Sequence, residues 1–176
     1  MRQVARLRWY FIIGLFVCVF LDGAVSQQMA NQLFRHSTSM VPEFTALWLM
    51  AAAFFEDDIH MPTYWFAVVA GIIFDIFYMG YWGIYVFIFP VIVWLAKTLR
   101  RYLPVNLFAT LLVCFLGFAL QSLLSWIAFQ IIGVTSASLA DFLVVALAPT
   151  LAFNEIMVLI FYLPLRQLYL RRQSSR

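Results

Sequence analysis

Residues 61–97, MPTYWFAVVAGIIFDIFYMGYWGIYVFIFPVIVWLAK, decide the fold, because they contain two long apolar runs joined by a short turn. The turn carries Gly80 and Gly83, and each flanking run has the composition of a membrane-spanning helix. Asp75 lies inside the first run, and a carboxylate at membrane depth costs a few kcal/mol if it faces lipid. We therefore expect Asp75 to face a partner inside the protein, an aqueous cavity, or to carry a proton.

Gly71 precedes Asp75 by one helical turn, so both residues lie on the same face of the helix. A small residue on a helix face lets another backbone come close. The sequence therefore predicts that Gly71, Asp75, Gly80 and Gly83 form a surface for close packing, either within the chain or with a partner's helix.

The composition describes an all-α integral membrane protein. Of the 176 residues, 65% are hydrophobic and 11% are charged, whereas about 25% of the residues of soluble domains are charged. We expect residues 1–176 to form a single polytopic transmembrane domain. Cys18 and Cys114 fall in apolar runs and are predicted to be free thiols, with no metal site.

The apolar runs predict about six spans, and Pro90 and Pro149 predict a kink or break within two of them. The first span follows a basic segment and could instead be a cleaved signal peptide, although Asp22 near its end favours retention. The expected spans are residues 9–26, 39–55, 61–79, 81–96, 105–132 and 138–165.

The basic residues fix the expected orientation. With six spans, the segments 1–8, 97–101 and 166–176 lie on one side of the membrane and contain ten of the eleven lysines and arginines. Positive charge marks cytoplasmic loops, so we expect both termini in the cytoplasm and Arg35 outside. This distribution explains the net charge of +3 without nucleic acid as a partner.

Three further acids lie near the expected outer ends of helices. Asp22 could line an outward-facing polar cavity with Arg35 as its counter-ion, or it could be a solvated helix end. Glu43 and Asp141 are expected at helix N-termini, where the helix dipole stabilises carboxylates.

The last span carries Pro149, Asn154 and Glu155 within its apolar run. A proline frees the carbonyl one turn earlier, and intramembrane Asn or Glu marks a contact with another helix. We favour a hydrogen-bonded seam with Gln121 and Ser125 of the preceding span. A transported ion or bound ligand, and a surface for a partner helix, are the alternatives.

The sequence contains no nucleotide-binding loop, no HExxH motif, and no Ser/His or Cys/His pair that six spans would bring together. We therefore expect no catalytic residue, no cofactor and no enzymatic activity.

The order of these motifs resembles the MreD family of rod shape-determining proteins, over nearly the whole chain. The residues that carry the resemblance are Asp22; Pro42, Phe44 and Leu47; Gly71-Ile72-Ile73-Phe74-Asp75; Gly80 and Gly83; and Pro149-Thr150 with Asn154.

The resemblance implies a multi-pass protein of the bacterial cytoplasmic (inner) membrane that takes part in cell elongation. It implies a non-enzymatic scaffold that binds MreC through transmembrane helices, beside a SEDS glycosyltransferase and a class B penicillin-binding protein, and so maintains cell shape and peripheral peptidoglycan synthesis.

The family is similar in fold to the substrate-binding subunits of energy-coupling-factor vitamin transporters, and membership of that second group is the alternative function. Span one lacks the Ala-x-x-x-Ala motif common in those subunits. Bulky residues at 76–79 depart from the small polar residues usual after the signature Asp of the MreD family.

Overall fold

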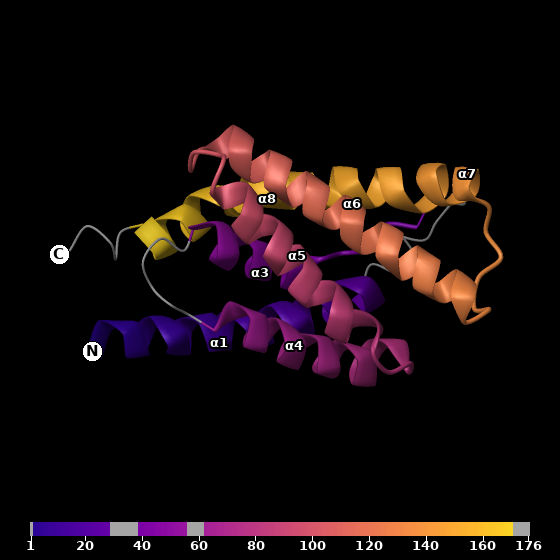
Figure 1. Ribbon diagram of the computed structural model, residues 1–176, viewed down its shortest axis with the longest axis horizontal. Coiled ribbons are helices and arrows are strands. Elements are labelled where there is room, and N and C mark those ends of the chain that lie inside the picture. Colours follow the sequence, from indigo (N-terminus) through magenta and orange to yellow (C-terminus); the bar gives the residue numbers. More distant parts are fainter. Residues whose placement is uncertain (1, 29–38, 56–61, 171–176) are drawn as a thin grey trace.

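The computed structural model describes residues 2–28, 39–55 and 62–170, which are mostly helical (Figure 1). The helices are α1 (Arg2–Gln28), α3 (Phe44–Phe55), α4 (Thr63–Phe74), α5 (Ile84–Arg100), α6 (Leu107–Ile131), α7 (Leu139–Asp141) and α8 (Ala148–Leu170). A π-helical turn, Asp75–Met79, continues α4. A second π-helical turn, Phe142–Leu147, joins α7 to α8.

Three helical stretches of the described residues are long and apolar enough to cross a membrane: Trp9–Gln28, Leu107–Ile131 and Leu139–Gln167. Phe44–Phe55 and Thr63–Met79 are shorter apolar helices. The all-α class predicted from composition is confirmed.

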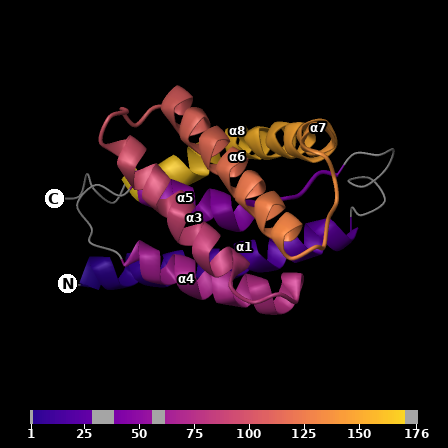
Figure 2. The ribbon, with the colours of Figure 1, turned by 45° about the vertical axis from the view of Figure 1, so that its right-hand side comes forward.

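The first turn of α1, the end of α5 and the last turn of α8 lie at the same end of the bundle (Figures 1 and 2). The three segments richest in basic residues thus begin or end at one face of the bundle, as an even number of spans requires. That this face is cytoplasmic stays a prediction.

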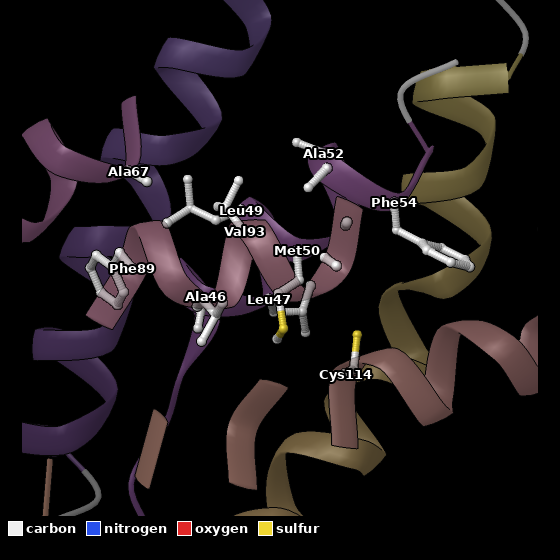
Figure 3. Packing of buried hydrophobic residues seen from close by; sticks show 14 of the residues in the cluster. Ala46, Leu47, Leu49, Met50, Ala52, Phe54, Ala67, Phe89, Val93 and Cys114 are labelled. Carbon is white, nitrogen blue, oxygen red and sulfur yellow. The ribbon is translucent and has the colours of Figure 1, made fainter. Parts of the chain in front are cut away.

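Helix α3 lies at the centre of the bundle, and it packs against α1, α4, α5, α6 and α8. All of its side chains are buried except Trp48, which is partly exposed and donates its indole N–H to the Phe11 carbonyl at 3.2 Å. Leu49 lies beside Val93 of α5 (Figure 3). Because α3 is apolar on every side, it forms the core on which the other helices pack.

The start of α3 differs from the prediction of a span over 39–55. The helix begins at Phe44, and residues 39–43 are extended. A 12-residue helix is about 18 Å long, shorter than the roughly 30 Å hydrocarbon core of a bilayer. This helix alone is thus too short to cross a bilayer, and the non-helical backbone of the extended segment before it must find partners inside the protein.

The fourth predicted span, 81–96, is also displaced. Helix α5 begins at Ile84, after the turn that contains Gly80 and Gly83, and it continues to Arg100. Pro90 lies inside this helix.

Gly71 sets the distance between α4 and α5. A Cβ at position 71 would lie 2.5 Å from the Tyr85 carbonyl oxygen and 2.6 Å from the Val86 Cα. The close approach predicted for Gly71 thus occurs, and the approaching helix is α5 of the same chain. The expectation that this face receives a partner's helix is therefore not supported.

We predict that Gly71→Ala destabilises the protein by about 1–3 kcal/mol, because the backbone of α5 must move away from the added methyl group. The measurement is the midpoint of thermal unfolding in detergent. Ile72→Ala is the control, since Ile72 is exposed and its truncation should change stability by less than about 0.5 kcal/mol. Equal midpoints for Gly71→Ala and the unaltered protein would contradict the close packing of α4 on α5.

Candidate functional site

Asp22 of α1 caps the N-terminus of α3. Its side chain is 3% exposed, and its oxygens accept the backbone N–H groups of Phe44 at 2.6 Å and Thr45 at 3.0 Å. The first N–H groups of a helix have no partner within the helix, and the helix dipole favours a carboxylate there. Asp22 is therefore neither a solvated helix end nor free to line a cavity. Arg35, its expected counter-ion, lies outside the described residues.

Asp75 performs the same task for α5. The side chain is 1% exposed; Oδ1 accepts the Tyr85 N–H at 2.9 Å, and Oδ2 accepts the N–H groups of Gly83 at 2.9 Å and Val86 at 3.4 Å. Gly80 and Gly83 adopt positive φ angles of 69° and 97°, which let the chain reverse direction between the carboxylate and the helix it caps. Asp75 thus faces the protein interior, and its partner is the backbone of α5.

Thr150 and Asn154 of α8 hold the extended segment that precedes α3. Asn154 is fully buried; its amide nitrogen donates to the Val41 carbonyl at 2.8 Å, and its Oδ1 accepts the Glu43 N–H at 2.9 Å. The Thr150 hydroxyl accepts the Val41 N–H at 3.1 Å and lies 3.3 Å from the Ser39 carbonyl, to which it donates. These side chains supply the partners that the non-helical backbone lacks.

Pro149 has no backbone N–H group, and this frees a carbonyl of the preceding turn to bind residue 39. In a regular helix that N–H would bond to the carbonyl of Val145, four residues earlier. Here the Val145 carbonyl accepts the Ser39 N–H at 2.8 Å. The carbonyl one turn before the proline therefore binds the same extended segment.

The seam predicted between spans five and six is built differently. The side chain of Asn154 forms hydrogen bonds with residues 41, 43 and 150, and Ser122 of α6 donates to the Glu43 carboxylate at 3.3 Å. Ser125 bonds back to the Ser122 carbonyl at 3.0 Å. Segment 39–43 is thus the element to which the polar groups of both helices bind.

The acids predicted at helix starts differ in burial. Asp141 is exposed, and Ser138 caps its helix by accepting the Asp141 N–H at 3.2 Å. Glu43 directly precedes α3, as expected, but it is 5% exposed and lies beside Gln121 and Ser122. Sequence reasoning missed this pairing, although the presence of Glu and Gln in apolar runs was a signal for it.

Glu155 is partly exposed on α8, and its Oε1 atom is buried without a hydrogen-bond partner. Within the residues that the structure describes, no group of three or more His, Cys, Asp or Glu is placed to hold a metal ion.

We predict that Asp75→Asn destabilises the protein by about 1–3 kcal/mol, because an amide presents one acceptor and an N–H donor to three backbone N–H groups. Unfolding in detergent, followed by tryptophan fluorescence, measures the change. The same substitution at exposed Asp141 should have a much smaller effect. Equal losses at the two positions would show that Asp75 does not hold α5.

We predict that Asn154→Leu lowers stability by about 2–4 kcal/mol, since the Val41 carbonyl and the Glu43 N–H then lose their partner. Asn154→Asp keeps the acceptor for Glu43 but loses the donor, so its unfolding midpoint should also fall. Ile156→Leu, on the exposed side of α8, is the control. A midpoint unchanged by both Asn154 substitutions would exclude this residue as the support of segment 39–43.

The comparison with protein families matches the chain over residues 5–172 to the model described as rod shape-determining protein MreD. Neither the comparison with curated proteins nor that with solved structures found a match. The family model covers nearly the whole chain, and the helices have the apolar composition of an integral membrane protein. The chain therefore belongs to the MreD family of rod shape-determining proteins.

Proposed function

We propose that this protein is a multi-pass scaffold of the bacterial cytoplasmic membrane that supports peripheral peptidoglycan synthesis during cell elongation. In this proposal it binds the bitopic protein MreC through transmembrane helices, next to a SEDS glycosyltransferase and a class B penicillin-binding protein. The match to the MreD family over residues 5–172 carries the proposal, because that family acts in rod shape determination.

The buried polar groups support a scaffold role. Asp22, Asp75 and Asn154 all bind backbone groups of other segments, so their hydrogen-bonding capacity is used to hold helices together. A rigid helical framework of this kind can present a fixed outer surface to a partner, with little ordering cost on binding.

The outer face of α8 is the surface we propose for MreC, because the Gly71 face is filled by α5. Ala148 and Ala152 are exposed and lie one turn apart, and Glu155 follows on the same side of the helix. Small residues four apart let a second helix come close, and a carboxyl group at membrane depth favours a polar contact over lipid.

We predict that Ala152→Leu lowers the amount of MreC recovered with the tagged protein from native membranes by at least about tenfold, the equivalent of 1.4 kcal/mol. The larger side chain would keep a partner helix away from the α8 backbone. Quantitative mass spectrometry of the mildly solubilised complex measures the recovery.

The matched control is Ala24→Leu, the same substitution at an exposed alanine of α1, which should leave MreC recovery unchanged. Equal recovery with both variants, at equal expression, would exclude the α8 face. Recovery of ATP-binding-cassette and coupling subunits in place of MreC would overturn the scaffold proposal in favour of a transporter.

A further inference from the structure

Glu43 is a buried acid with no positively charged group acting on it among the described residues. The side chain is 5% exposed, Oε1 accepts the Ser122 hydroxyl at 3.3 Å, and the Gln121 side chain is a further hydrogen-bonding neighbour of the carboxyl group. Its second oxygen, Oε2, is buried and has no hydrogen-bond partner among the described residues. A buried carboxylate in this condition is strongly unfavourable unless a positive species joins it.

Gln121 of α6 also has a buried side-chain oxygen without a hydrogen-bond partner in the described part of the chain. Its side chain is 3% exposed and lies beside the Glu43 carboxyl group, and its Oε1 atom is also buried and unpartnered. Two neighbouring, enclosed side chains thus each present an oxygen with nothing to bind. A hydrogen-bond donor or a cation could satisfy both oxygens.

Among the described residues, no lysine or arginine is placed to act on the Glu43 carboxyl group. Asp22 on α1 carries the same sign as Glu43, and the Tyr85 side chain of α5 is a neutral phenol. Three N–H groups at the start of α3 already have acceptors: those of Phe44 and Thr45 bind Asp22, and that of Glu43 binds Asn154.

We propose that Glu43, Gln121 and Ser122 form a binding site for a monovalent metal cation, with Na⁺ as the ion to be tested. Carboxylate, amide and hydroxyl oxygens are the ligands that hard cations prefer. One carboxylate balances one positive charge, whereas Ca²⁺ sites gather several carboxylates. The bound ion would neutralise Glu43 and join the start of α3 to α6.

The experiment measures thermal unfolding of the full-length protein in detergent at fixed pH. NaCl replaces N-methylglucamine chloride at constant ionic strength, so that only the identity of the cation changes. Because a ligand that binds the folded state raises stability with its concentration, we expect a saturable rise of at least about 2 °C in the midpoint. Glu43→Gln and Gln121→Met should each abolish the rise, and Asp141→Asn should keep it.

Identical midpoints in the two salts would overturn the proposal, as would a Na⁺ response that survives in a folded Glu43→Gln or Gln121→Met protein. A midpoint that follows pH but not Na⁺ would assign a proton to Glu43 and exclude the metal cation. The assay contains no MreC, so its outcome is independent of the scaffold proposal.

Discussion

The Asp22 carboxylate accepts the N–H groups of Phe44 and Thr45 at the start of α3, and the central position of α3 requires this interaction. All side chains of α3 except Trp48 are buried, and the bonds that its first N–H groups form with Asp22 are buried as well. In such a place an unpaired N–H is costly, and a backbone partner from the same helix does not exist. Asp22, which belongs to α1, accepts these N–H groups, and the same bonds connect α1 to the core of the bundle.

The same solution recurs at two other breaks in helical structure. Asp75 caps α5 after a turn whose glycines have positive φ angles, and α8 binds the extended segment before α3 through Thr150, Asn154 and the Val145 carbonyl. Anionic or polar groups of bound molecules commonly occupy helix N-termini inside membrane proteins. Here side chains of the chain itself occupy the starts of α3 and α5, which favours a framework over an open substrate site.

Glu43, Gln121 and Glu155 each keep an oxygen without a hydrogen-bond partner among the described residues, but their side chains differ in exposure. Glu43 and Gln121 are enclosed between α3 and α6, so only a small species could satisfy them. The Glu155 side chain on α8 remains partly exposed, so another protein could reach it, although its unpartnered Oε1 atom is itself buried. Residues that looked alike in the sequence, as acids within apolar runs, therefore differ in what they can bind.

The sequence by itself determined the helical membrane class and the approximate positions of most helices, and it predicted that the termini lie at one end of the bundle, because hydrophobicity, length and charge distribution are properties of each segment alone. It also predicted that Asp75 turns inward and that Gly71 is approached closely. Only the tertiary structure decided that α5 fills the Gly71 face, that α3 begins at Phe44, and that Asp22 and Asn154 bind its start. These contacts join residues from 14 to more than 100 positions apart, and local pattern cannot specify which backbone group a buried side chain will meet. The local pattern predicted a span from residue 39, but the bonds from α8 hold residues 39–43 extended, so the helix begins only at Phe44.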